Sequence, residues 1–343
     1  MKFEMPSDDD RPLWDLWLSS LWLPSVTAAE ELGLFETISR RPGTVQELVA
    51  ETGFNPRGME TLLSLLAALG FLAVRDARHH VTDTTRNYLL RDSPYYWGGV
   101  LERARANSPM HAAIKNAVSR GISMRATHPD EPNRPAESWA LGQIERGQAL
   151  AVARFMHSHS LPAALGAARN GDFAGVKRLL DVGAGSGCFS ITLAQRFPEM
   201  RCTVMELPAM CRIAADYIKD GEVGDRVDTR AVDMFRQDWP TGYDAVFFSN
   251  IFHDWSFETC AQLAKKAYDI LPPGGRIYLH EMLLNDNADG PRTAAAFSVL
   301  MLLGTEGRQF TFEELRTLLA GAGFKDVTAT ATYGYYSLVA GHK

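Results

Sequence analysis

The feature that most constrains the fold is an alternation of short β-type segments with helical segments from Val176 onward. The β-type segments are rich in branched and aromatic residues and read KRLLDVGAG, RCTVME, VDTRAV, AVFFSN and RIYLHEML. The segments between them, such as PAMCRIAADYIKD and FETCAQLAKKAYDIL, are helical in pattern. This alternation predicts βαβ units and therefore an α/β fold with a parallel sheet covered by helices on both faces.

The tail of the chain predicts a different connection. It reads VTATATYGYYSLVAGHK, in which two β-type segments are separated only by Gly334 and tyrosines. A connection this short joins antiparallel strands. We therefore expect an antiparallel hairpin at the end of the parallel sheet.

The part of the chain from residue 12 to about 110 is predicted to be mainly helical. Thr44 and Glu47 form a capping box at the start of one helix, and a longer helix ends at Gly70. The segment HHVTDTTRNYLL, which follows, is expected to hold a short strand pair. A short helix, a longer helix and a small hairpin suggest a winged-helix arrangement. Because the longer helix offers Arg57 and little other positive charge, we expect a protein-contact module and no nucleic acid partner.

Length and charge reduce the classes of function that the chain can have. The chain has 343 residues, a net charge of −6 and a pI near 5.9, which suits about two domains and lacks the basic footprint of a nucleic acid binder. The N-terminus is acidic and no apolar stretch approaches the ~18 residues of a membrane span. The four cysteines have no CxxC spacing, which argues against a zinc site or a disulfide framework. We therefore expect a cytoplasmic protein with no metal and no membrane contact.

These patterns predict three regions. Residues 1–110 form the winged-helix-like module, residues 111–170 a helical linker region and residues 171–343 the α/β domain. Within the linker region, residues 127–137 read THPDEPNRPAE and are expected to form a loop.

The first strand of the α/β domain runs into a glycine-rich turn, Asp181-Val-Gly183-Ala-Gly185-Ser-Gly187. Glycines at this position let the chain turn tightly and let a ligand approach the bare backbone. The spacing is GxGxG, whereas dinucleotide binders have GxGxxG. A tight turn that holds no ligand is the simpler alternative.

Further acidic residues stand near the ends of the next strands. Glu206 ends the second strand and could accept hydrogen bonds from ribose hydroxyls, or it could cap the following helix. Asp233 follows the third strand. Acids at consecutive strand ends together with a glycine turn indicate an adenosine-type ligand. Since no Lys or Arg lies between Asp181 and Arg196 to bind phosphates, S-adenosylmethionine fits better than a nucleotide polyphosphate.

His253 follows the fourth strand, in FFSNIFHDW, and therefore belongs to the same sheet edge. An imidazole titrates near neutral pH and can take a proton from a hydroxyl group. A structural loop histidine is the alternative. Asp254 and Ser256 could cap the next helix, and Trp255 is expected to be a packing residue.

A general base needs an orienting partner, and Glu281 can supply it. Glu281 stands near the end of the fifth strand, next to the fourth strand if the order is regular. His280 points to the opposite face of that strand and is interpreted as structural. An acceptor would bind among apolar side chains, which could equally be core or dimer contacts: Phe297, Met301 and Leu302.

Several motifs occur in the order found in one family. GAGSG, the acid at Glu206, DMF, SNIFHDW, LPPGGRIYLHEMLL and TEGRQFTFEEL resemble the plant-type small-molecule O-methyltransferases and their bacterial relatives in secondary metabolism. The likeness covers nearly the whole chain. It implies a Rossmann-like S-adenosylmethionine-dependent methyltransferase domain with an N-terminal helical winged-helix dimerisation domain.

The resemblance also implies residue roles. The expected contacts to S-adenosylmethionine are Gly183, Glu206, Asp233, Met234 and Ser249. His253 would be the general base, with Glu281 as its partner. The plant enzymes have a second glutamate where Gln309 stands and a lysine where Ser249 stands. Gln309 can orient an imidazole by a hydrogen bond but supplies no charge.

We therefore expect a homodimeric O-methyltransferase that acts on a hydroxyl of a small, aromatic metabolite. The segment LWDLWLSSLWLP is too apolar for an exposed helix and is expected to form the dimer contact. Methylation of carbon or nitrogen is the nearest alternative. A cyclase, decarboxylase or hydroxylase on the same fold is a further one, and a transcription factor is disfavoured by the acidic charge.

Overall fold

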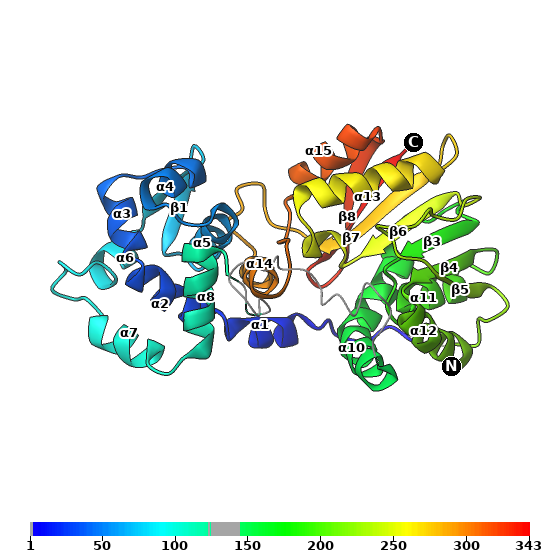
Figure 1. Ribbon diagram of the computed structural model, residues 1–343, viewed down its shortest axis with the longest axis horizontal. Coiled ribbons are helices and arrows are strands. Elements are labelled where there is room, and N and C mark those ends of the chain that lie inside the picture. Colours follow the sequence, from blue (N-terminus) through cyan, green and yellow to red (C-terminus); the bar gives the residue numbers. More distant parts are fainter. Residues whose placement is uncertain (1–2, 123, 125–144) are drawn as a thin grey trace. The chain divides into compact units, whose positions relative to one another are not determined.

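The computed structural model describes residues 3–122, 124 and 145–343 (Figure 1). The chain forms two compact units. The sheet unit comprises Met1–Asp10, Pro135–Met282 and Phe312–Lys343, and the helical unit comprises Arg11–Arg134 and Leu283–Thr311. The loop expected at 127–137 lies outside the described residues.

The sheet unit contains a seven-stranded sheet of order β5-β4-β3-β6-β7-β9-β8. Its strands are β3 (Arg178–Val182), β4 (Arg201–Glu206), β5 (Val227–Ala231), β6 (Ala245–Ser249), β7 (Arg276–Met282), β8 (Lys325–Tyr333) and β9 (Tyr336–His342). Strands β3 to β7 are parallel, and β9 pairs antiparallel with both β7 and β8. The predicted parallel sheet and its terminal hairpin are confirmed.

The strand order places a switch point between β3 and β6. The chain runs outward from β3 to β4 and β5, then returns to the other side of β3 to form β6 and β7. In sheets of this kind, ligands bind beyond the carboxyl ends of the strands where the order reverses. The carboxyl ends of β3, β4, β5 and β6 carry the glycine turn and the polar residues discussed below.

Helices cover both faces of the sheet. Figure 1 shows α13 (Phe257–Ile270) and α15 (Phe312–Ala322) on one face, and α11 (Cys188–Arg196) and α12 (Pro208–Asp220) on the other. The long helix α10 (Arg146–Asn170) packs along α11 and α12.

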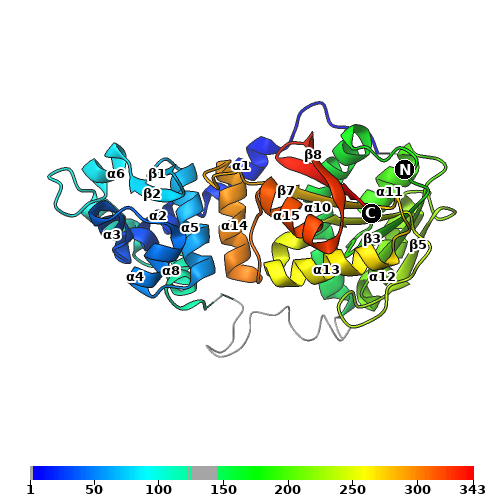
Figure 2. The ribbon, with the colours of Figure 1, turned by 90° about the horizontal axis from the view of Figure 1, so that it is seen from above.

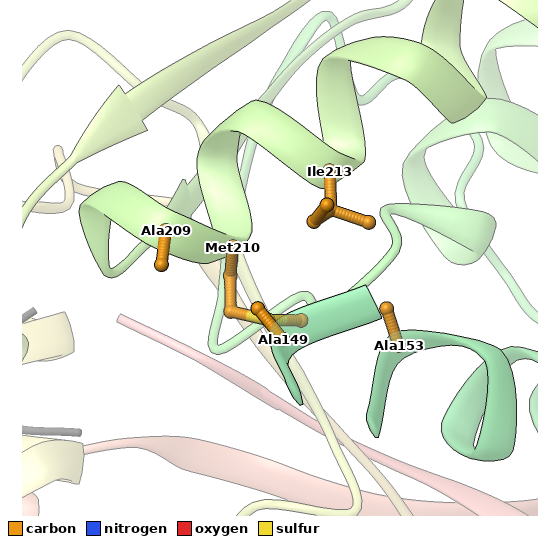
Figure 3. Close-up of a cluster of buried hydrophobic side chains, with 5 residues drawn as sticks. All are labelled: Ala149, Ala153, Ala209, Met210 and Ile213. Atoms are coloured by element: carbon orange, nitrogen blue, oxygen red, sulfur yellow. The ribbon is translucent and has the colours of Figure 1, made fainter. Parts of the chain in front are cut away.

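A small apolar cluster joins α10 to α12. Ala149 and Ala153 of α10 pack against Met210 and Ile213 of α12, with Ala209 alongside them (Figure 3). The alanines have short side chains, so the two helices can approach closely. The start of α12, directly after Glu206, is thereby held in place.

The helical unit begins with α1 (Arg11–Ser19), α2 (Trp22–Glu31) and α3 (Leu34–Arg40), and continues with α4 (Val45–Thr52), α5 (Pro56–Ala68), α7 (Gly98–Arg105) and α8 (Pro109–Arg120). The predicted capping box is confirmed, because the side chain of Thr44 accepts from the backbone N–H of Glu47 and the Glu47 side chain accepts from that of Thr44. Among the described residues, no helix combines the length and apolar character needed to cross a bilayer.

The hairpin of the helical unit lies earlier than predicted. It consists of β1 (Leu72–Arg75) and β2 (Arg78–Val81), whereas the strand pair was expected from residue 79 onward. The turn is formed by Asp76 and Ala77, both in the left-handed region with φ of 50° and 59°. The remainder of the segment forms α6 (Asp83–Tyr88), which Thr82 caps. A turn without glycine gave no sequence signal.

The two compact units also differ from the predicted boundaries at 110 and 170. Residues 283–311, including α14 (Arg292–Gly304), join the helical unit although they follow β7 in sequence. Figure 2 shows α14 beside α5 and α1. Helix α10 belongs to the sheet unit and is not a separate linker.

Long-range hydrogen bonds hold residues 283–311 in the helical unit. Arg57 of α5 donates to the carbonyl oxygens of Thr305 and Gly307, both at 2.9 Å, and Ser64 donates to that of Ala288 at 2.5 Å. Arg57, the one cation considered for nucleic acid contact, is therefore occupied within the fold. Such pairings between distant segments leave no periodic trace in the sequence.

The apolar residues considered for acceptor binding lie in the core of the helical unit. Phe297, Met301 and Leu302 of α14 are all buried. The ring of Phe297 packs against that of Trp14, with a centroid distance of 5.5 Å. For Phe297, the core interpretation therefore holds.

Candidate cofactor and catalytic site

The glycine turn after β3 has a backbone conformation that favours glycine. Gly183, Gly185 and Gly187 all have positive φ, between 56° and 74°. A Cβ atom at Gly183 would lie 2.4 Å from Cδ1 of Ile251. At Gly185 a Cβ would meet nothing within 4 Å, so that glycine is required by its backbone conformation and borders open space. The open space beside Gly185 fits a turn over which a ligand can lie.

Glu206 links this turn to the end of β4. Its Oε1 accepts from the backbone N–H of Gly185 at 3.1 Å, and its Oε2 accepts from that of Leu207 at 2.7 Å. Burial raises the pKa of Glu206 above its ordinary value, although these two hydrogen bonds act in the opposite direction. Leu207 is the N-cap residue of α12, so part of the predicted helix-end role is present. Each carboxylate oxygen keeps a further acceptor site for a ligand hydroxyl.

Asp233 organises the turn that follows β5. Its Oδ1 accepts from the backbone N–H of Phe235 at 2.9 Å and of Arg236 at 3.2 Å. The carbonyl oxygen of Met234 accepts from the indole N–H of Trp239 at 2.9 Å. Asp233 and Met234 are partly buried at the same sheet edge as Glu206. Their contact with a cofactor stays a prediction.

The segment after β6 turns sharply before His253. Asn250 is buried with φ of 53°, and its side-chain N–H donates to the hydroxyl of Tyr336 at 3.2 Å. A short 3₁₀ helix, η1 (Phe252–Asp254), then carries His253. Ser256 caps α13 by accepting from the backbone N–H of Thr259, as predicted. The turn and the cap together fix the short segment that presents the imidazole.

Glu281 of β7 holds both this segment and its imidazole. Oε1 accepts from the backbone N–H groups of Ile251 and Phe252 at 3.1 and 3.0 Å. Oε2 lies 3.0 Å from Nδ1 of His253. His253 and Glu281 are only 3% and 1% exposed, so the pair interacts with little screening by water. The predicted neighbourhood of the two side chains is confirmed.

The charge of Glu281 changes the chemistry of His253. Burial by itself would lower the pKa of His253, but the opposing effects of Glu281 and, more weakly, Asp254 raise it above its ordinary value. With Nδ1 facing a carboxylate, the neutral tautomer carries its proton on Nδ1 and leaves the lone pair on Nε2. The arrangement can accept a proton at Nε2 and stabilise the resulting cation.

Ser249 and His280 pair across the neighbouring strands β6 and β7. The Ser249 hydroxyl lies 3.2 Å from Nδ1 of His280. His280 is fully buried, as expected for a structural residue. Its contact with a candidate cofactor residue was not foreseen.

Gln309 belongs to the helical unit, whereas His253 and Glu281 belong to the sheet unit. Gln309 is buried, and its backbone N–H donates to the hydroxyl of Ser298 at 3.1 Å. Its role beside His253 stays a prediction.

Sequence reasoning missed two histidines of α10. Nδ1 of His157 lies 2.8 Å from the hydroxyl of Ser186 in the glycine turn, and its ring stacks on Tyr217 of α12 at 4.5 Å. Burial, with a contribution from the charge of His253, lowers the pKa of His159 to about 4. The sequence MHSHS was the available signal, but nothing in it relates α10 to the sheet edge.

Comparisons with known proteins agree with this architecture. A family model described as an O-methyltransferase domain matches residues 135–325. A second, described as an O-methyltransferase dimerisation domain, matches residues 14–91.

Individual relatives match over nearly the whole chain. The 3-hydroxy-5-methyl-1-naphthoate 3-O-methyltransferase of Streptomyces sahachiroi is 33% identical, over 95% of this chain and 93% of the relative. The L-tyrosine C(3)-methyltransferase of Streptomyces lavendulae is 29% identical, over 94% and 88%. The crystal structure of an O-methyltransferase family 2 protein from Planctomyces limnophilus, in complex with apigenin, is 26% identical with a TM-score of 0.87 and covers 100% of both chains.

Proposed function

The chain belongs to the O-methyltransferase family and is an S-adenosylmethionine-dependent methyltransferase, and we propose that it methylates a hydroxyl group of a small aromatic metabolite with His253 as the general base. The observation that carries the assignment of the base is the 3.0 Å contact between Nδ1 of His253 and the buried carboxylate of Glu281, at the edge that bears the glycine turn. The relative named as a 3-hydroxy-5-methyl-1-naphthoate 3-O-methyltransferase supports the acceptor class.

The residues at the sheet edge suit this cofactor. We assign the ribose hydroxyls to Glu206, which keeps acceptor sites beside the glycine turn at Gly183, and the adenine end to Asp233 and Met234. Ser249 would complete the site on the other side of the turn. When bound, S-adenosylmethionine supplies an activated methyl group.

His253 supplies the proton acceptor. A phenol has a pKa near 10 and is mostly neutral at pH 7, so removing its proton as the oxygen attacks contributes ~10²–10⁴-fold. The O–H proton would pass to Nε2 of His253 while the phenol oxygen takes the methyl group, whose bond to the sulfur would break and leave S-adenosylhomocysteine. Glu281 stabilises the imidazolium that results, because its carboxylate lies against Nδ1. The imidazolium then returns its proton to solvent.

A series of phenols of falling pKa tests the role of His253. The His253→Ala variant should be most defective on weakly acidic phenols and least defective on phenols that are already ionised, because those need no base. Equal defects across the series would mean that His253 only positions the acceptor.

Carbon methylation is the second candidate function. It is favoured by the 29% identity to an L-tyrosine C(3)-methyltransferase, and the same base could deprotonate a phenol that then reacts at carbon. Product analysis with methyl-labelled cofactor distinguishes the two outcomes, since an O-methyl ether and a C-methyl phenol differ in their NMR spectra.

The match to a dimerisation domain supports a homodimer. Helix α1 buries Trp14 and Leu18 but leaves Leu13 and Leu16 69% and 72% exposed, and Leu23 of α2 is 52% exposed. An apolar surface of this kind suits a second copy of the chain.

Sedimentation of the double variant Leu13→Asp/Leu16→Asp tests this. The variant should be monomeric at micromolar concentration, whereas Val100→Asp, an exposed site outside the matched domain, should stay dimeric. A wild-type protein that sediments as a monomer would contradict the proposal.

The four free, buried cysteines fit a reducing compartment, and we place the protein in the cytoplasm.

A further inference from the structure

A buried chain of hydrogen bonds runs from the candidate cofactor residue Ser249 into the sheet. The Ser249 hydroxyl lies 3.2 Å from Nδ1 of His280, and Nε2 of His280 lies 2.9 Å from the hydroxyl of Thr332 on β8. The Thr332 hydroxyl in turn donates to the backbone carbonyl of Tyr336, at 3.1 Å. His280 and Thr332 are 0% and 5% exposed, so water has little access to these links.

The positions of the protons in this chain follow from its buried end. The Tyr336 carbonyl can only accept, so the single proton of the Thr332 hydroxyl is directed to it. Thr332 must then accept from His280, which places the imidazole proton on Nε2. Nδ1 is left as an acceptor, and the Ser249 hydroxyl donates to it. Toward the cofactor site, Ser249 consequently presents only lone pairs.

The surroundings of His280 keep the imidazole neutral, so this pattern is not disturbed by protonation. Burial lowers the pKa of His280 to about 3. Its ring is stacked on Tyr336 with a centroid distance of 4.9 Å and an interplanar angle of 7°, and Phe189 lies 5.0 Å away. Any flat ring could pack in this place, but packing does not explain why both nitrogen atoms of the imidazole meet hydroxyl groups.

The strand order indicates which part of the cofactor Ser249 would meet. Asp233 follows β5, Glu206 ends β4, and Ser249 ends β6 on the other side of β3 and its glycine turn. If Asp233 holds the adenine end and Glu206 the ribose, the methionine end extends toward β6. That end carries a carboxylate as well as the positively charged sulfonium and ammonium groups, and of these groups it is the cations that a hydrogen-bond acceptor meets best.

We propose that His280 is a positioning residue, which holds the Ser249 hydroxyl as an acceptor toward a cationic group at the methionine end of the cofactor. The inference rests on the cofactor site proposed above. It differs from the role of His253, because His280 would contribute to cofactor affinity and not to proton removal.

The tautomer of His280 is the first test and needs no activity. Nitrogen-15 NMR of the histidine side chains should show His280 with a protonated Nε2 and an unprotonated Nδ1. A protonated Nδ1 would reverse both hydrogen bonds of the imidazole and overturn the inference. The assignment can be made by comparison with the His280→Phe variant, whose flat ring keeps the stack on Tyr336.

Calorimetry on a matched pair of variants is the second test. Thr332→Val removes the hydroxyl that fixes the tautomer and should weaken binding of S-adenosylmethionine about ten-fold, the scale of one lost hydrogen bond to a charged group. Thr332→Ser keeps the hydroxyl and should bind like the wild type. Ser249→Ala should lose as much affinity for S-adenosylmethionine as Thr332→Val. The double variant Thr332→Val/Ser249→Ala should bind no more weakly than Ser249→Ala alone.

The same titrations with S-adenosylhomocysteine identify the cationic group. Loss of affinity for both ligands indicates the ammonium group, and loss for S-adenosylmethionine alone indicates the sulfonium group. Unchanged affinity of Thr332→Val for both ligands overturns the inference. The Glu206→Ala variant distinguishes this result from failure of the proposed cofactor site. If Glu206→Ala binds the cofactor weakly and Thr332→Val binds it normally, only the role of His280 is refuted.

Discussion

The two faces of strand β7 carry two buried histidine sites with opposite chemistry. On one face, His253 lies against the carboxylate of Glu281, and its pKa is raised. On the other, His280 lies between two neutral hydroxyl groups, and burial lowers its pKa to about 3. Because both imidazoles are almost fully buried, the degree of burial cannot explain the difference. A charged partner makes the first a proton acceptor, and neutral partners make the second a fixed hydrogen-bonding group.

The largest expected effect comes from removing the imidazole on the charged face. His253→Ala should lower kcat by ~10²–10⁴-fold on a weakly acidic phenol while leaving affinity for S-adenosylhomocysteine nearly unchanged. His280→Phe should show the opposite pattern, with weaker cofactor binding and a smaller change in kcat at saturating cofactor. Steady-state kinetics and calorimetry on both variants check this. If the two variants showed the same pattern, the contrast between the faces would be wrong.

Asp181 extends the comparison to a buried carboxyl group with a neutral partner. Its Oδ2 accepts from the hydroxyl of Ser190 at 2.7 Å, and burial raises its pKa to about 7. The unfolded chain has an Asp pKa near 3.9, so the folded state holds its proton more tightly. The stabilising contribution is therefore complete below about pH 4 and is lost as the pH rises toward 7.

The isosteric variant Asp181→Asn should remove this pH dependence, since the amide cannot ionise. Each pKa unit corresponds to about 1.4 kcal/mol. The difference in the free energy of unfolding between wild type and variant should therefore change by up to roughly 4 kcal/mol between pH 4 and pH 8. Urea unfolding at both pH values measures it. A constant difference between the two proteins would show that Asp181 is ionised throughout.

Glu206 is a carboxylate whose partners are backbone N–H groups, so it should act on binding and not on proton transfer. Glu206→Ala should weaken S-adenosylhomocysteine binding by roughly 1–3 kcal/mol, as measured by calorimetry. Glu206→Gln is the matched control for shape, because it keeps one acceptor oxygen. Equal affinity of wild type and Glu206→Ala would remove the ribose assignment and leave only the helix-end role.

Much of the arrangement at the carboxyl edge of the sheet was predictable from the parallel strands. Glu206, Ser249 and Glu281 end or nearly end the parallel strands β4, β6 and β7, and the carboxyl ends of parallel strands meet at one edge of the sheet. Alternation along a strand likewise predicted that His280 and Glu281 face opposite ways. These inferences need only the strand periodicity and the strand order.

The features that the sequence did not reveal depend on packing between distant segments. Residues 283–311 join the helical unit through hydrogen bonds from Arg57 and Ser64. His157 reaches the glycine turn because α10 packs on α11 and on α12, the latter through the apolar cluster of Figure 3. His280 was interpreted as structural because it faces away from Glu281 on the same strand, and no local pattern revealed its second partner, Thr332 on β8.

The measurement that tests the central claim most directly is an NMR titration of His253 in the wild type and in Glu281→Gln. The amide of the variant keeps an oxygen for the backbone N–H groups of Ile251 and Phe252 but carries no charge. We expect a pKa above the ordinary ~6.5 in the wild type and below it in the variant, where only the weaker effect of Asp254 opposes burial. We also expect that the acid limb of kcat/KM moves to lower pH with it, and that kcat falls by up to roughly ten-fold for each unit of pKa lost. The same pKa in both proteins would contradict the claim that Glu281 makes His253 the base.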